Sequence, residues 1–335
     1  MRFFERQDEA RRETLRLVLL FAAAVAATVA GVHLALAACW LALSLLSPLA
    51  LPFPRFFFTV NVGVTLLLIL GGWWLEAASL RLPGAAQRLA RRLGAREARP
   101  AVSADEQRLA NIVDEICIAA RMPRPEVMLM PRHQAINAFA AGWDVHDAVV
   151  AVTQGALEQL TREELQGLVA HECSHLHEGD TRLNMQLAGM VSGLELVWDF
   201  GATVRERGGV ALLFGGAIMG MGAAGWYAGR LLQAAVSRQR ELLADARAVQ
   251  WTRSRDGLGG VLRKALTQRN EAQERPADPP LPGLVQHLLL LGPPAGQDGR
   301  LDAHPPLALR IERIYGRPMP PLPLPRPPAP VFHWA

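Results

Sequence analysis

Two long uncharged stretches near the N-terminus constrain this chain most, because uncharged apolar segments of this length belong in a lipid bilayer. Leu17 to Pro54 contains no Asp, Glu, Lys or Arg, and Phe56 to Leu75 is a second such run. As a helix the second run would be about 30 Å long, which matches the hydrocarbon core of a membrane. A proline-containing break separates the runs. The pattern predicts a transmembrane hairpin within residues 1–80, with helices at about 17–46 and 56–76.

Arginine positions orient this hairpin. Only Arg55 lies in the turn, whereas two arginine groups flank the hairpin: Arg2, Arg6, Arg11, Arg12 and Arg16 before it, and Arg81, Arg88, Arg91, Arg92, Arg96 and Arg99 after it. Cytoplasmic flanks of membrane helices carry an excess of positive charge. We therefore expect a multi-pass protein of the inner (cytoplasmic) membrane, with residues 81–102 as a basic linker and everything after it in the cytoplasm.

A third uncharged run, 208–229, is rich in glycine, and the apolar stretch before it, 184–204, carries two acidic residues. If the third run crossed alone, the downstream residues would leave the cytoplasm. Two arrangements remain open: both stretches cross as a hairpin, or both are buried or re-entrant. The spacing of Gly216 and Gly220 predicts a close contact between helices.

Composition restricts the partners of the chain. Half of the residues are hydrophobic (50%), and the net charge of +4 is not gathered in a basic run interleaved with aromatic residues. This pattern argues against nucleic-acid binding. The 3 cysteines show no pairing pattern, so we expect no disulfide framework.

The pentad His171-Glu-Cys-Ser-His175 carries the chemistry. Two imidazoles four residues apart on a helix point the same way and can reach one metal ion. The carboxylate of Glu172 lies close enough to take a proton from a water at that metal. Cys173 lies on the opposite side of the helix and is expected to be a small core residue.

Capping signals place this pentad on a helix. Thr161 and Glu164 form a Thr-x-x-Glu capping box ahead of apolar residues, and Gly179 is the expected end of the helix. A second box begins at Ser103 and opens a helix through Ala120.

Short apolar segments predict a small sheet; they are Glu126–Met130, Ile136–Trp143 and Ala148–Val152. Residues 276–302 are rich in Pro and Gly and predict a loop, and the proline-rich tail 317–335 predicts an extended or disordered end.

A catalytic metal site needs a third protein ligand. Glu241 and Asp245 lie four residues apart, so Glu241 can bind the metal while Asp245 holds a ligand histidine by its other ring nitrogen. An amphipathic helix with two solvated acids is the alternative that spacing alone leaves open.

The chain resembles the HtpX-type membrane zinc metallopeptidases, which are related to the CAAX prenyl endopeptidases. Four blocks carry the resemblance in order: Ile136-Asn-Ala-Phe-Ala140; Val152-Thr-Gln-Gly155 running into Glu164 and the pentad; Ser237-Arg-Gln-Arg-Glu-Leu-Leu-Ala-Asp245; and His304-Pro-Pro306 with Arg310-Ile311. The resemblance implies one Zn²⁺ on His171, His175 and Glu241, with Glu172 as the base and Asp245 behind a ligand. Cys173 and Leu242 stand where bulkier or aromatic residues are common in the family.

We therefore expect a mainly α fold with a small β-sheet. The transmembrane hairpin would precede a zincin-type metallopeptidase domain, 103–316, which carries a further hydrophobic helical insertion. The resemblance implies cleavage of polypeptides in quality control of misfolded membrane proteins, and the arginine positions put that cleavage on the cytoplasmic side. CAAX-type prenyl-peptide processing and a non-catalytic zinc scaffold are the alternatives. An intramembrane protease is disfavoured because charged residues crowd the motif helix.

Three further residues have open roles. His304 is a donor to the tetrahedral oxyanion, a fourth ligand that blocks the metal, or a turn residue. Arg310 is a second candidate oxyanion donor. Asn137 either orients an edge strand that pairs with substrate or is a buried structural residue.

Overall fold

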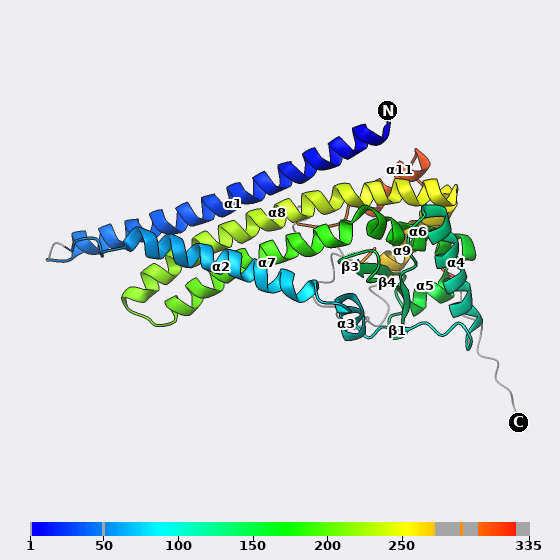
Figure 1. Ribbon diagram of the computed structural model, residues 1–335, viewed down its shortest axis with the longest axis horizontal. Helices are drawn as coiled ribbons and strands as arrows, with labels where there is room; N and C mark the ends of the chain where they lie inside the picture. The colour runs from blue at the N-terminus through cyan, green and yellow to red at the C-terminus, as the bar shows by residue number, and fades with distance from the viewer. Residues whose placement is uncertain (1, 49–50, 272–288, 291–300, 326–335) are drawn as a thin grey trace, which may run out of the picture. The chain divides into compact units, whose positions relative to one another are not determined.

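The computed structural model describes residues 2–48, 51–271, 289–290 and 301–325, and the chain forms two compact units. Unit 1 comprises Met1–Arg81 and Met185–Val236, and unit 2 comprises Leu82–Asn184 and Ser237–Ala335. The described chain is mainly helical with a single small sheet, which confirms the predicted fold class (Figure 1).

Unit 1 is built from apolar helices. Leu34 and Leu67 remain 66% and 72% exposed, as lipid-facing side chains do. Within the described residues, four helices are long and apolar enough to cross a membrane. They are α1 (Arg2–Leu46), α2 (Phe57–Leu80), α7 (Asp180–Arg205) and α8 (Val210–Thr252).

Helices α7 and α8 approach each other closely through glycines. A Cβ atom on Gly201 or Gly215 would lie 2.3 Å from a backbone nitrogen of the other helix. The prediction that Gly216 and Gly220 make such a contact is wrong, because a Cβ on either would meet nothing within 4 Å. These two glycines lie on a different side of α8, so the four-residue spacing identified the helix but not its contact face.

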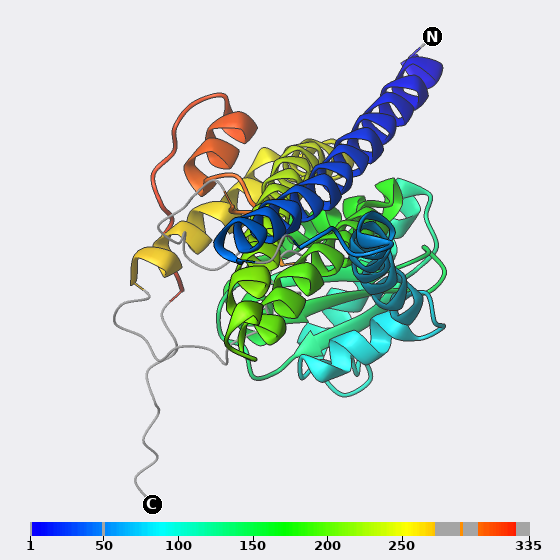
Figure 2. The same cartoon turned by 90° about the vertical axis from the view of Figure 1, so that its left-hand side faces the viewer.

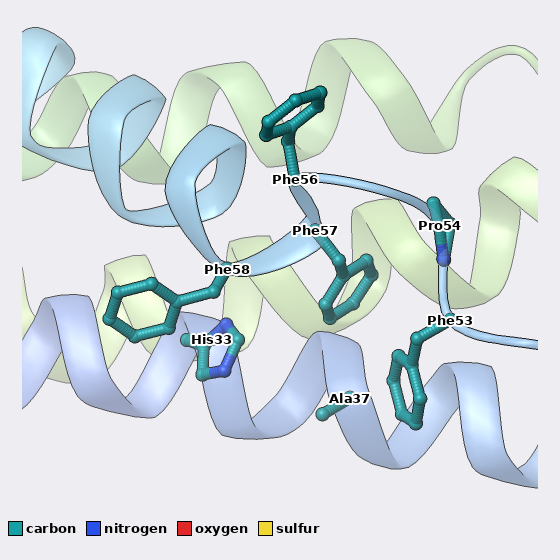
Figure 3. A pocket seen from close by; sticks show the side chains of 7 residues that line it. All are labelled: His33, Ala37, Phe53, Pro54, Phe56, Phe57 and Phe58. Carbon is teal, nitrogen blue, oxygen red and sulfur yellow. The ribbon is translucent and has the colours of Figure 1, made fainter.

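An aromatic cluster joins α1 to the start of α2. It surrounds a hollow of about 400 Å³ (Figure 3) lined by His33, Ala37, Phe53, Pro54, Phe56, Phe57 and Phe58. The imidazole of His33 lies 5.0 Å from the ring of Phe58 in an edge-to-face arrangement. Ring packing of this kind contributes about 0.5–1.5 kcal/mol per pair beyond the area it buries.

Unit 2 contains a four-stranded sheet in the order β1-β2-β4-β3, so β3 lies at an edge. β2 and β4 pair in parallel, and β3 pairs antiparallel with β4; Figure 2 shows the strands side by side. The strands are β1 (Arg96–Glu97), β2 (Glu126–Met130), β3 (Ala138–Gly142) and β4 (Ala148–Thr153). Thus all three predicted strands form.

Helices pack against this sheet and build one hydrophobic core. Cys173 is fully buried in that core, as predicted. The helices of unit 2 are α3 (Ala85–Arg92), α4 (Ala104–Ala120), α5 (Gln154–Gln159), α6 (Arg162–Glu178), α9 (Arg255–Glu271) and α11 (Leu307–Tyr315), together with the parts of α7 and α8 in this unit.

Both predicted N-caps form, but only one closes as a complete capping box. At α6, Thr161 and Glu164 bond reciprocally, and Gly179 ends the helix in the left-handed region at φ 75°. At α4, the side chain of Ser103 caps the helix. The carboxylate of Glu106 turns away and accepts hydrogen bonds from Arg96 instead.

Helix α9 holds the motif helix α6 at close range. A Cβ on Gly167 would lie 2.3 Å from the backbone nitrogen of Leu258, so only glycine fits at this crossing. The ammonium of Lys264 on α9 donates to Glu164 at 2.7 Å and to the Gln159 carbonyl at 2.9 Å. The close backbone approach at Gly167 and the ion pair between Lys264 and Glu164 therefore both hold α6 against α9.

The proline-rich tail is extended over its described part, which is one of the two predicted alternatives. The guanidinium of Arg263 donates to the carbonyl of Pro320 at 2.7 Å, and the hydroxyl of Thr267 donates to that of Leu322 at 2.6 Å. Both donors lie on α9, so the extended tail packs along that helix. Most of the predicted loop 276–302, and the tail after 325, lie outside the described residues.

Candidate active site

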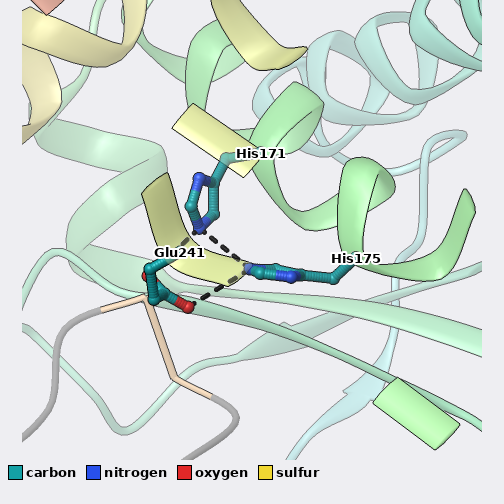
Figure 4. Close-up of side chains that lie close together, drawn as sticks. All are labelled: His171, His175 and Glu241. Atoms are coloured by element: carbon teal, nitrogen blue, oxygen red, sulfur yellow. Dashed lines mark hydrogen bonds and ion pairs between the residues drawn. The ribbon is translucent and has the colours of Figure 1, made fainter. Parts of the chain in front are cut away.

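Three side chains converge on one point in unit 2 (Figure 4): His171 and His175 from α6, and Glu241 from α8. The Nε2 atoms of the two imidazoles lie 3.1 Å apart. The carboxylate oxygens of Glu241 lie 3.6 Å from Nε2 of His171 and 3.3 Å from Nε2 of His175. Ligands at 2.0–2.1 Å from a tetrahedral metal are separated by about 3.3–3.4 Å. The three donors therefore fit a single metal ion.

The ring nitrogen of His171 that faces away from the cluster lies beside Asp245, the acid that the sequence predicts for this position. Nδ1 of His171 lies 3.0 Å from Oδ1 of Asp245. Asp245 stands one turn after Glu241 on α8, so the same helix supplies one of the three converging donors and an acid that contacts another of them. A carboxylate on the far ring nitrogen fixes the tautomer and orientation of a metal-binding imidazole.

Arg310 lies behind these acids rather than at an open surface. It is fully buried, and its guanidinium donates to both oxygens of Asp245, at 2.9 and 2.7 Å. Its Nη1 donates to the Leu290 carbonyl at 3.0 Å and lies 3.1 Å from Oε2 of Glu241. The guanidinium of Arg310 is therefore directed at groups of the protein itself. Its contacts with Asp245 and Glu241 can hold both carboxylates in place.

The second histidine contacts an acid that the sequence patterns did not predict for this position. Nδ1 of His175 lies 3.0 Å from Oδ2 of Asp180, the first residue of α7. Burial alone would lower the pKa of His175, but its contacts with Asp180 and Glu241 raise that pKa well above its usual range. The available signal was an aspartate just beyond the C-cap glycine of α6, five residues after His175.

Glu172 is buried beside this cluster at 1% exposure. Within the described part of the chain, neither of its carboxylate oxygens has a hydrogen-bond partner. Burial raises the pKa of its carboxyl group. An unpaired buried carboxyl group of this kind is suited to exchanging a proton with a bound reactant.

Asn137 stands at the entry to β3. Its backbone nitrogen donates to Oγ1 of Thr153 at 3.0 Å, and its side-chain oxygen accepts from the nitrogen of Ala138 at 3.0 Å. The outer edge of β3 is partly occupied, because Leu290 donates to the carbonyl of Ala138 at 2.9 Å and Leu289 forms a bridge with Phe139. The edge position that we predicted is thus confirmed, and part of that edge already pairs with the chain.

His304 reaches the same cluster from a segment distant in sequence. Its Nδ1 lies 3.3 Å from Oε2 of Glu241, and its side chain is 11% exposed. The structure therefore brings together the pentad, Glu241, Asp245, His304 and Arg310, which span more than a hundred residues of sequence.

Comparisons with known proteins agree with this geometry. Residues 103–317 match the model of the family described as Peptidase family M48. The chain is 34% identical over 220 residues to a protease HtpX homolog of Thermoanaerobacter pseudethanolicus, covering 62% of this chain and 70% of the relative. It is 35% identical over 225 residues to a protease HtpX homolog of Lactobacillus acidophilus, covering 63% and 74%. No solved structure matches the chain.

A motif helix with two histidines, completed by a glutamate from a second helix, defines a metallopeptidase, and the apolar helices anchor it in a membrane. The chain belongs to peptidase family M48, and its relatives place it among the HtpX-type proteases. It therefore acts on peptide substrates with the help of a metal ion.

Proposed function

We propose that this protein is a zinc endopeptidase in which His171, His175 and Glu241 hold the metal. The observation that carries the proposal is the convergence of two imidazole nitrogens and one carboxylate, all buried, at tetrahedral spacing. Two nitrogens and one oxygen suit Zn²⁺, and a catalytic zinc site keeps its fourth position open. When bound, zinc supplies the Lewis acidity that activates water and polarises the scissile carbonyl.

Glu172 is the proposed general base. Its unpaired carboxylate accepts a proton from the attacking water and returns the proton to the leaving amine. Asp245 and Arg310 act through the ligands, because their contacts orient His171 and Glu241. His304 donates to the tetrahedral oxyanion, blocks the metal as a fourth ligand, or is a turn residue; its place beside Glu241 supports the first two roles.

The substrate is proposed to be an extended polypeptide that pairs with the edge strand β3. Backbone pairing is indifferent to side chains and therefore suits an enzyme that acts on many unfolded sequences. Asn137 fixes the start of this edge through its contact with Ala138. Because Leu290 already bonds Ala138, the substrate backbone must displace that pairing or extend beyond it.

We place the protease domain on the cytoplasmic side of the inner membrane, in quality control of misfolded membrane proteins. The arginine distribution around the first hairpin supports this orientation. Helices α7 and α8 are joined by a tight turn, and both are long and apolar enough to cross. Crossing as a pair would return Glu241 to the side that holds His171.

The test compares casein cleavage by the detergent-purified protein with cleavage by Glu172→Gln, with the zinc content of both measured. We expect equal zinc and loss of cleavage in the variant. Glu163→Gln is the matched control, since it makes the same change on an exposed position of α6 that contacts Ser254. Cleavage by Glu172→Gln at the control's rate would exclude Glu172 as the base, and absence of zinc from wild type would exclude the metal assignment.

A further inference from the structure

We propose that Asp180, supported by Arg240, is the positioning residue for the metal ligand His175. The inference rests on the proposed metal site and adds two residues to it. Asp180 is 2% exposed, and its two carboxylate oxygens face different partners: Oδ2 lies 3.0 Å from Nδ1 of His175, and Oδ1 lies 3.1 Å from Nη1 of Arg240.

The contact with His175 selects one tautomer of the imidazole. A carboxylate accepts a hydrogen bond and cannot donate one, so Nδ1 of His175 must carry the proton. In the neutral ring this leaves the lone pair on Nε2, the atom that faces His171 and Glu241. Asp180 therefore prepares the correct ring nitrogen for the metal and restricts rotation of the ring.

The ion pair with Arg240 offsets the free-energy cost of burying the carboxylate of Asp180. A carboxylate removed from water needs a charged or hydrogen-bonding partner, and the guanidinium supplies one. Arg240 directly precedes Glu241 on α8. The turn of α8 that presents one ligand thus also supports the residue that orients another.

The site contains two matching chains of contacts. His171 is backed by Asp245, which is bonded by Arg310, and His175 is backed by Asp180, which is paired with Arg240. Each imidazole of the proposed metal site therefore contacts an acid through Nδ1, and that acid is paired with an arginine. Because both imidazoles and both acids are buried, loss of either acid should weaken metal binding rather than only the fold.

Thr181 provides a matched control next to Asp180. It is also buried, and its hydroxyl donates to the Gly142 carbonyl at 2.8 Å. Within the described residues, its side chain makes no hydrogen bond or ion pair with His171, His175 or Glu241. A substitution there removes a buried hydrogen bond from the same junction without touching His175.

The experiment measures the zinc dissociation constant of the full-length protein in detergent by competition with a chromophoric chelator. Loss of a support to a ligand histidine typically weakens metal binding about 10–100-fold. We expect that loss for Asp180→Ala, a smaller one for Asp180→Asn, and none for Thr181→Val. If Arg240 acts through Asp180, then Asp180→Ala/Arg240→Met binds zinc no more weakly than Asp180→Ala.

Substitution of Co²⁺ for zinc gives a second readout that stability alone does not move. The visible absorption of the bound Co²⁺ should change in Asp180→Asn and remain that of wild type in Thr181→Val. A zinc dissociation constant for both Asp180 variants within twofold of wild type would overturn the proposal while leaving the proposed function intact. Wild-type protein that binds zinc no better than His171→Ala would instead refute the metal site itself. Should Asp180→Ala fail to fold, Asp180→Asn alone decides.

Discussion

Lys264 offers a sharp test of how the motif helix is held, because it is the single lysine of the chain. Its side chain is 10% exposed and bonds Glu164, whose carboxylate also accepts from the backbone nitrogen of Thr161 at the start of α6. Lys264→Met keeps the length and the apolar stem but leaves the buried carboxylate of Glu164 without a counter-charge. Removing one partner of a buried ion pair costs about 3–5 kcal/mol of unfolding free energy.

The double variant Glu164→Gln/Lys264→Met isolates the charge effect. Glutamine can still accept from the nitrogen of Thr161 as a capping-box residue, and no uncompensated charge remains. We therefore expect the double variant to recover most of the loss and to lie within about 1–2 kcal/mol of wild type. The recovery measures how much of the single variant's loss comes from the uncompensated charge.

Urea unfolding of the detergent-solubilised protein, followed by tryptophan fluorescence, supplies the free energies. Reductive ¹³C-methylation adds a local probe, because a single lysine gives a single dimethyl-lysine resonance. Arg91→Met is the control, since the Arg91–Glu97 pair is largely exposed and such pairs contribute about 0–1 kcal/mol. The reasoning is refuted if Lys264→Met costs no more than Arg91→Met, or if the double variant is as unstable as the single one.

Two further predictions concern acid stability and His304. The hydrogen bond from Arg96 lowers the pKa of Glu106 below its usual 4.5, against the opposing effect of burial. A carboxyl group with a lowered folded-state pKa stabilises the fold above its usual pKa, and that contribution is lost as the pH falls through the folded-state pKa. The difference in unfolding free energy between wild type and Glu106→Gln should therefore be largest near neutral pH and shrink in acid, and a difference that grows in acid would contradict the assignment. For His304→Ala, casein cleavage should fall about 10²–10³-fold if the imidazole stabilises the oxyanion and should rise if it blocks the metal; unchanged cleavage would leave His304 a turn residue.

Several elements of this protein could be predicted because their signals are local. The capping box of Thr161 and Glu164, the stop at Gly179 and the i, i+4 spacing of the two histidines are all fixed within one helix. Long uncharged runs likewise identify membrane helices by length alone. The spacing of glycines does not show which face of a helix meets its neighbour. Only the packing of the helices shows that Gly215, and not Gly216, lies at the contact with α7.

The sequence alone determined the class of chemistry: a helix with two histidines and a glutamate, together with apolar helices that belong in a bilayer. Glu241 and Asp245 came from spacing combined with a family resemblance. The tertiary structure alone decided that Arg310 is buried behind the acids and that Asp180 lies within hydrogen-bond distance of His175. It also decided that Leu290 occupies part of the edge of β3. These contacts join residues from separate elements, and such pairs are set by how helices and strands pack rather than by the residues beside them in the chain.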